Sequence, residues 1–156
     1  MKLLGIWRGS HVARSLLYIA VAATNFVQVG CEQAKSKHDI AVIHIRDGDI
    51  AWISSNVAGH SDLVESRDPW DQSTLLHFSC VNAQNRDAVE ALLKAGCDPD
   101  AKNDLGQTPL HLAYEFAASK EVIDLLLKYG ARSDVLDVYG NAPKYYEEAA
   151  SRDKVP

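Results

Sequence analysis

Two histidines, His77 and His111, are the side chains whose type could support chemistry, and they lie in two similar stretches of the chain. A histidine ring changes charge near neutral pH, so it can act as a general base or as a metal ligand. Each ring, however, follows a threonine by three residues, Thr74 and Thr108, where it can reach that threonine at the start of a helix. We therefore predict a structural role for both histidines and no catalytic residue in the chain.

A run of acidic and amide side chains, Asp98, Asp100, Asn103 and Asp104, is superficially similar to a calcium-binding loop. Such a loop needs an oxygen ligand at its fifth position and a glycine at its sixth. Lys102 and Asn103 occupy those two positions, which argues against a calcium site. The sequence also lacks a glycine-rich phosphate loop and the Gly-x-Ser-x-Gly turn of hydrolases. We predict that the protein binds no metal and no cofactor.

The chain has three cysteines. Cys31 belongs to an N-terminal segment described below, while Cys80 and Cys97 lie in the part of the chain that we expect to fold. Free cysteine behaves as a small apolar side chain, so we predict that Cys80 and Cys97 are buried. An oxidising compartment would permit a bridge between them, and their pairing stays open. The sequence has no Cys-x-x-Cys pair of the kind that indicates a zinc site.

The residues that define the helices around these side chains recur along the chain. Identical residues are separated by one constant number of positions, the same that separates Thr74 from Thr108. Self-similarity at a fixed period of this size indicates a stack of helix-turn-helix units, each of which buries its apolar face only against its neighbours. The leucine pairs predict the buried faces of the second helices, and the glycines predict left-handed residues at helix ends. The pairs at this offset are Thr74 and Thr108, His77 and His111, Leu92 and Leu126, Leu93 and Leu127, and Gly96 and Gly130.

The segment Gly106-Gln107-Thr108-Pro109-Leu110-His111-Leu112-Ala113 resembles the Thr-Pro-Leu-His-x-Ala signature of ankyrin repeats. Thr108 suits the residue before a helix, and Pro109 suits the first helical position, where its missing N–H removes no hydrogen bond. The resemblance implies an all-α fold, an ankyrin-repeat solenoid of stacked helix-turn-helix units with β-hairpin-like connecting loops. It implies about two full repeats plus terminal caps, and a protein that binds another protein.

Deviations from the repeat pattern predict a cap at each end of the solenoid, because a terminal repeat must expose one polar face to water. At the first cap, Asp47-Gly48-Asp49 predicts a turn between two short helices. At the second, Gly140-Asn141-Ala142-Pro143 repeats the opening of a repeat and precedes a single helix that ends near Ser151. The predicted ankyrin-repeat domain covers residues 38–152, with caps at 38–68 and 137–152, full repeats at 69–102 and 103–136, and a tail at 153–156.

Residues 1–31 carry three basic and no acidic residues, with a short apolar run at 16–23. A positive start, a short apolar centre and small residues after it are typical of a bacterial secretory signal. Val29-Gly30-Cys31 resembles a lipoprotein processing site, which makes Cys31 the lipidation candidate and residues 32–37 a polar tether. Three interpretations stay open: a lipoprotein signal, an ordinarily cleaved signal, and an uncleaved anchor or mis-assigned start. The first two export the repeats to the periplasm or to a membrane of the cell envelope.

Without residues 1–31 the chain has 13 basic and 21 acidic residues, a net charge of −8. Nucleic acid phosphates require clustered Lys and Arg, so we predict no nucleic acid partner for a surface this acidic. The same charge repels anionic lipid, so any membrane association has to come from Cys31 or from the N-terminal apolar run. It favours a basic or mixed protein surface as the partner.

The loop tips between repeats supply the candidate binding residues. In ankyrin stacks these tips and the exposed side of the first helices form a concave binding face. The candidates combine apolar and aromatic side chains with carboxylates, a composition typical of binding hot spots. A second interpretation is that the aromatic side chains fold back over neighbouring loops and seal the stack. The partner-binding candidates are Trp70, Asp71, Asp104, Leu105, Val138 and Tyr139.

These observations predict a non-catalytic protein–protein interaction module in the bacterial cell envelope. Two other functions stay open, a cytoplasmic ankyrin adaptor with an uncleaved N-terminal segment and an envelope immunity protein that neutralises a toxin. Removal of residues 1–31 would distinguish the exported forms from the cytoplasmic adaptor.

Overall fold

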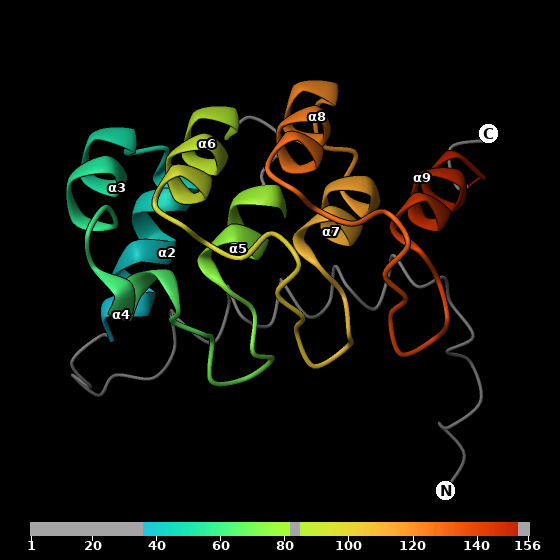
Figure 1. Cartoon of the computed structure of the whole chain (residues 1–156), viewed down its shortest axis with the longest axis horizontal. Coiled ribbons are helices and arrows are strands. Elements are labelled where there is room, and N and C mark those ends of the chain that lie inside the picture. Colours follow the sequence, from blue (N-terminus) through green and yellow to red (C-terminus); the bar gives the residue numbers. More distant parts are fainter. Residues whose placement is uncertain (1–35, 82–84, 153–156) are drawn as a thin grey trace, which may run out of the picture. The chain divides into compact units, whose positions relative to one another are not determined.

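The computed structural model describes residues 36–81 and 85–152, and the regular structure over these ranges is helical (Figure 1). The predicted all-α fold is therefore confirmed. Within the same ranges, one isolated antiparallel β-bridge joins Arg67 to Thr74. The helices in chain order are α2 (Lys37–Asp47), α3 (Ile50–Asn56), α4 (Ser61–Val64), α5 (Leu75–Val81), α6 (Arg86–Lys94), α7 (Pro109–Glu115), α8 (Lys120–Lys128) and α9 (Pro143–Arg152).

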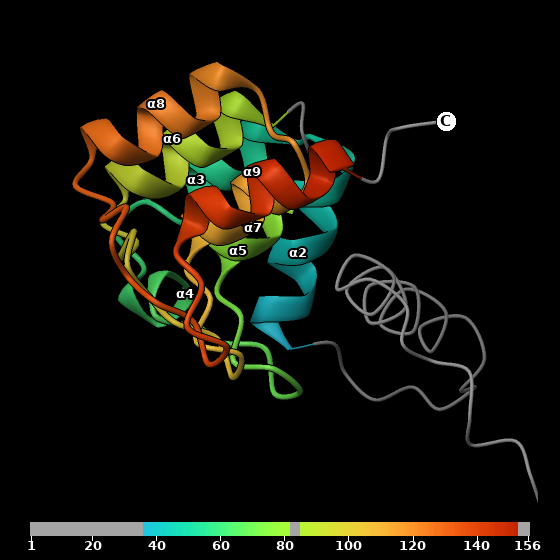
Figure 2. The ribbon, with the colours of Figure 1, turned by 90° about the vertical axis from the view of Figure 1, so that its right-hand side faces the viewer.

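The helices of this part of the chain form two layers. The first layer contains α2, α5, α7 and α9 side by side, and the second contains α3, α6 and α8 (Figures 1 and 2). Each helix of the second layer packs against the helix that precedes it in the first layer, so α2–α3, α5–α6 and α7–α8 are helix-turn-helix units. The paired stacking is that of the expected repeat solenoid.

The first helices of the two central units begin with the same pair of residues. At the start of α7, the hydroxyl and the backbone nitrogen of Thr108 lie 2.9 and 3.0 Å from Nδ1 of His111, and Pro109 occupies the first helical position. At the start of α5, the corresponding atoms of Thr74 lie 2.8 and 3.1 Å from Nδ1 of His77. Each histidine thus satisfies a backbone N–H that would otherwise lack a partner at the helix start.

The core follows the register that the repeat predicts at three of the four leucines paired between the second helices. Leu93 is buried, but Leu127 is 41% exposed, so the prediction of a buried side chain is wrong there. Leu92 of α6 and Leu126 of α8 are fully buried, and so are Leu76 of α5 and Leu110 of α7. Burying a leucine side chain stabilises a fold by about 1.5–3 kcal/mol. These leucines belong to one apolar cluster shared by all the units, and the helices of neighbouring units contact each other, so each unit depends on its neighbour for the burial of its apolar face.

The N-terminal cap contains the two predicted short helices, α2 and α3. They are joined at Gly48, whose φ of 72° lies in the left-handed region. Ser36 and Asp39 form a reciprocal capping box at the start of α2. Asp49 caps α3 by accepting a hydrogen bond from the backbone nitrogen of Trp52 at 3.0 Å. Local capping chemistry therefore defines both helices of the cap.

Three features of the connections depart from the regular repeat. The sequence does not predict α4, because its single buried side chain, Leu63, gives no periodic pattern. Ala117, between α7 and α8, has a left-handed φ of 50°, which costs a non-glycine residue about 1–2 kcal/mol. Buried Asn85, before α6, donates from Nδ2 to the carbonyl of Ile45 at 2.6 Å and so ties the first full repeat to the cap.

Cys80 and Cys97 are buried, as predicted, and both are free thiols. Burial raises the pKa of each thiol to about 12, so both stay protonated at neutral pH. The residues that the structure describes form no group of three or more His, Cys, Asp or Glu side chains that could hold a metal ion. No helix within 36–81 or 85–152 is long and apolar enough to cross a membrane.

The predicted signal, the lipidation candidate Cys31 and the tail at 153–156 lie outside the described residues. The same holds for residues 32–35 of the predicted tether. Its last two residues, Ser36 and Lys37, form the N-cap and the first residue of α2, because Ser36 belongs to the capping box.

Candidate protein-binding surface

Three hairpin-shaped loops, residues 68–73, 103–107 and 137–141, project on one side of the helices next to α5, α7 and α9 (Figure 1). In each loop the backbone nitrogen of the first residue donates to the carbonyl of the last. These bonds confirm the predicted β-hairpin-like connections, and we call the three loops the tip row. The bonds run from Asp68 to Ser73 at 2.8 Å, from Asn103 to Gln107 at 3.0 Å and from Asp137 to Asn141 at 3.0 Å.

A side-chain oxygen at the first position of each loop fixes the conformation of its tip. This oxygen accepts a hydrogen bond from the backbone nitrogen two residues later, as in an Asx turn. An acidic or amide residue therefore recurs at this position, and one of its oxygens is turned toward the loop. The bonds are those of Asp68 with Trp70 at 2.8 Å, Asn103 with Leu105 at 3.0 Å and Asp137 with Tyr139 at 2.8 Å.

Each loop also turns through one residue in the left-handed region. Gly106 and Gly140 have φ values of 69° and 79°, and Gln72 occupies the same position in the first loop with a φ of 59°. Glycine adopts this conformation without steric cost, whereas glutamine does not. A Cβ atom on Gly106 would lie 3.1 Å from the backbone nitrogen of Val138. Glycine at this position therefore also lets the last loop approach closely.

The tips of neighbouring loops are hydrogen-bonded to each other. The backbone nitrogen of Asp104 donates to the carbonyl of Asp71 at 2.8 Å. The backbone nitrogen of Val138 donates to the carbonyl of Leu105 at 3.0 Å. The two donors occupy equivalent positions of successive loops, as do the two acceptors, so the same bond repeats along the row.

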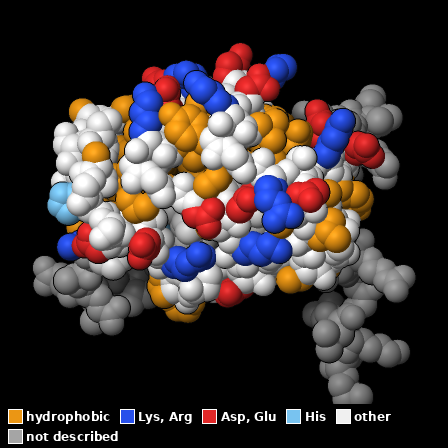
Figure 3. Space-filling view, in the orientation of Figure 1, with side chains coloured by type: hydrophobic (Ala, Val, Ile, Leu, Met, Phe, Trp, Pro, Cys, Tyr) orange, Lys and Arg blue, Asp and Glu red, His pale blue; other side chains and the backbone are white. Residues whose placement is uncertain are grey.

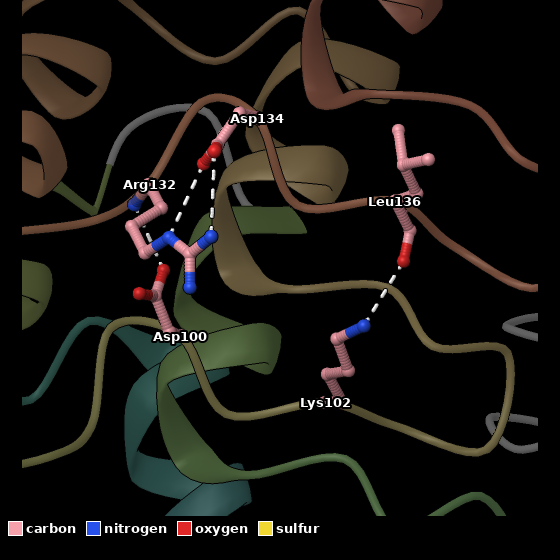
Figure 4. A network of polar contacts seen from close by, with 5 residues as sticks. All are labelled: Asp100, Lys102, Arg132, Asp134 and Leu136. Carbon is pink, nitrogen blue, oxygen red and sulfur yellow. Dashed lines mark hydrogen bonds and ion pairs between the residues drawn. The ribbon is translucent and has the colours of Figure 1, made fainter.

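Cationic side chains join the bases of the loops. The guanidinium of Arg67 donates to the carbonyl of Lys102 at 2.9 Å, and Nζ of Lys102 donates to the carbonyl of Leu136 at 3.0 Å. Figure 4 shows the second bond beside the one from the backbone nitrogen of Arg132 to Oδ1 of Asp100, at 2.8 Å. Together with the bonds between tips, these contacts make the tip row one connected surface.

His77 and His111 join each first helix to the following loop. Nε2 of His77 lies 3.0 Å from the carbonyl of Gln107, and Nε2 of His111 lies 3.2 Å from the carbonyl of Asn141. Because each Nδ1 accepts from a threonine nitrogen, each Nε2 carries the ring proton and donates it. Burial lowers the pKa of both rings, that of His77 to about 4, so both are neutral at pH 7. The predicted structural role of the two histidines is confirmed.

A family model described as ankyrin repeats, in three copies, matches residues 17–137. The chain belongs to the ankyrin-repeat family. It is similar to inversin of Gallus gallus, 34% identical over 91 residues, and to NF-kappa-B inhibitor alpha of Rattus norvegicus, 54% identical over 44 residues. The first alignment covers 58% of this chain and 8% of inversin, and the second covers 28% of this chain and 14% of the inhibitor. The chain thus matches a small part of each relative.

The tip row of this ankyrin-repeat protein brings all six predicted candidates onto adjacent loops. Trp70 is 83% exposed, Val138 60%, Tyr139 53% and Leu105 42%. At this exposure Trp70 does not fold back to seal the stack, which was the second interpretation of its role. Asp104 is exposed, whereas Asp71 is half-buried and bonds through both carboxylate oxygens to the nitrogen and hydroxyl of Ser73, at 2.9 and 2.8 Å.

The ankyrin-repeat loops also use residues that sequence reasoning did not single out. The Asp137 carboxylate is buried and accepts hydrogen bonds from the backbone nitrogen of Asn141 at 2.9 Å and from the hydroxyl of Tyr146. Burial raises the pKa of this carboxyl, but its hydrogen bonds outweigh burial and leave the pKa below its usual value. The recurrence of Asp68, Asn103 and Asp137 at nearly equal spacings is the signal that could have identified the position.

Proposed function

We propose that this ankyrin-repeat protein is a non-catalytic interaction module that binds another protein through the tip row and the adjoining side of the first helices. The observation that supports this is the combination of a connected row of loops with large exposed apolar side chains, Trp70, Leu105, Val138 and Tyr139. A surface that is already ordered loses little conformational entropy on binding. Exposed aromatic side chains are typical anchors of protein interfaces.

We also propose that the module acts in the bacterial cell envelope, with Cys31 as a lipid anchor. The support comes from the sequence of residues 1–31, with its basic start, short apolar run and Val29-Gly30-Cys31 ending. The family match begins at residue 17, inside this segment. The lipoprotein signal and an additional repeat element therefore make different predictions for this segment. Processing before Cys31 removes residues 17–30, whereas a repeat element retains them.

Binding is tested by comparing the full chain with its Trp70→Ala, Tyr139→Ala variant. Each protein is immobilised in equal amount and incubated with membranes and extracts of the cells that produce it, and retained proteins are identified by mass spectrometry. A partner retained by the unmodified chain and lost with the variant would support the tip row as the binding surface. Equal retention by both would contradict it.

Localisation is tested by the intact mass and the fractionation of the full chain and its Cys31→Ser variant. Lipidation predicts a mature N-terminus at Cys31 with added acyl mass, and release of the variant from membranes. A mature protein that keeps residues 1–31 and stays in the soluble fraction would contradict export and favour the cytoplasmic adaptor.

A further inference from the structure

The backbone that carries the apolar side chains of the tip row is fixed by hydrogen bonds within and between the loops. The backbone nitrogens of Trp70 and Tyr139 donate to the carboxylates of Asp68 and Asp137. The backbone carbonyl of Leu105 accepts a hydrogen bond from the next loop. The loops that carry them are bonded to one another at tip and base. The row therefore presents its apolar groups on connected loops rather than on separate ones.

Most carboxylates of the same loops accept hydrogen bonds from residues of their own loop or of the helix that follows it. Asp71 uses both oxygens for Ser73, and Asp137 uses its two oxygens for three donors. Asp68 accepts from the nitrogen of Trp70. Within the described ranges, Asp104 is the tip carboxylate that accepts no hydrogen bond. Of the described tip residues, Asp104 is thus the carboxylate with neither oxygen used by the loops, and Asp68 has one oxygen in use.

The cationic side chains beside the tips also form hydrogen bonds within the row of loops. Arg67 and Lys102 donate to backbone carbonyls of neighbouring loops. Figure 3 shows Lys and Arg side chains interspersed with Asp and Glu on the face that it displays, with no large area of one sign. Exposed ion pairs at such a surface add little to affinity, whereas a desolvated aromatic anchor contributes much more.

We infer that the tip row recognises an apolar segment of its partner, and that Lys and Arg of the partner are not required. This inference rests on the proposed binding role of the tip row, and it replaces the basic partner that net charge alone suggests. The net charge of the chain, −5, still affects how fast a partner is encountered. Recognition at the tips depends on Trp70, Leu105, Val138 and Tyr139, and the charge of Asp104 contributes little to it.

The test is a selection of random twelve-residue peptides displayed on phage against the full chain, with the Trp70→Ala, Tyr139→Ala variant used to remove peptides that bind elsewhere. We expect the selected peptides to be enriched in Leu, Ile, Phe, Met and Trp and not in Lys or Arg. The Kd of a synthetic peptide should change less than about threefold between about 50 and 500 mM NaCl, because screening acts on charges. The Trp70→Ala substitution should weaken peptide binding about thirtyfold or more.

Two control variants separate the contributions. Leu127→Ala removes an apolar side chain of α8 with 41% exposure, close to that of Leu105, and should leave the Kd unchanged. Asp104→Asn should change it less than about threefold. Val138→Ser, a second tip variant, should weaken binding while circular dichroism shows an unchanged fold.

The possible results have distinct meanings. Selected peptides rich in Lys and Arg, a tenfold loss of affinity in salt and a similar loss in Asp104→Asn would overturn the apolar partner while leaving the interaction role intact. If no peptide survives once those that also bind the double variant have been removed, recognition lies outside the tip row and the proposed function itself is contradicted.

Discussion

The loops before the two full repeats, residues 68–73 and 103–107, perform the same structural task with different residues. Both are closed by the same backbone bond, and both are fixed by a side-chain oxygen at their first position. The first loop is one residue longer, includes Pro69 and Trp70, and places Gln72 where the second has Gly106. The comparison shows that the hydrogen-bond pattern defines the loop. The tip residues differ between the two loops, and both Trp70 and Leu105 are exposed.

The leucine positions of the two repeats test whether their cores are equivalent. Leu126→Ala should reduce the free energy of unfolding by roughly 2–5 kcal/mol, because it removes a fully buried side chain and leaves a cavity. Leu92→Ala should have a similar effect in the first repeat, and exposed Leu127→Ala should cost much less. Urea unfolding followed by circular dichroism measures all three. A neutral Leu126→Ala would mean that the register of α8 is wrong.

The buried histidines should make the stack sensitive to acid. The pKa of His77 falls to about 4 in the folded protein, against about 6.5 in the unfolded chain. Below pH 6.5 the unfolded state binds more protons, so stability falls as the pH drops, by roughly 3 kcal/mol at pH 4 from this residue alone. Burial lowers the pKa of His38 and His111 as well, which adds to the effect.

The acid prediction is checked by urea unfolding between pH 7 and pH 4.5 for the unmodified chain and for His77→Gln. The variant should start from a lower stability and lose less of it on acidification. Equal slopes for the two proteins would show that His77 does not titrate in this way. Carboxyl groups with lowered pKa values, such as Asp137, protonate below the window in which the histidines act.

Exchanging the left-handed residues of the two loops should have opposite effects. Gly106→Ala should destabilise by about 1–3 kcal/mol, since the added Cβ meets the backbone of Val138 and the φ is unfavourable for alanine. Gln72→Gly should stabilise by about 0.5–1 kcal/mol, because relief of the left-handed strain exceeds the entropy that glycine gains in the unfolded chain. Thermal unfolding measures both, and a stabilising Gly106→Ala would contradict the close approach of the last two loops.

The smallest change is expected from the exposed aromatic residues. Trp70→Ala with Tyr139→Ala should shift the thermal midpoint by less than about 2 °C, because surface substitutions usually change stability by less than about 0.5 kcal/mol. The same variant should lose partner binding. A large fall in the midpoint would assign both residues to packing and remove them from the proposed surface.

The sequence predicted those parts of the molecule that recur. The constant offset between repeats placed the threonine–histidine pairs, the buried leucines and the glycines at helix ends, because each has one structural role in every unit. It did not reveal α4, with one buried side chain, or the bonds of Arg67 and Lys102, whose acceptors are backbone carbonyls. Such contacts depend on how neighbouring loops approach each other, which no residue type specifies.

The histidine bond between repeats has a consequence for the length of the module. His77 donates to the carbonyl of Gln107, and His111 donates to the carbonyl of Asn141, which occupies the equivalent position in the next loop. The junction between the two repeats and the junction with the final helix are therefore interchangeable at this bond. Tandem duplication of residues 103–136 would place the required backbone carbonyl next to each new histidine. The array can therefore be extended by whole repeats, each adding one loop to the tip row, with the same hydrogen bond at every junction.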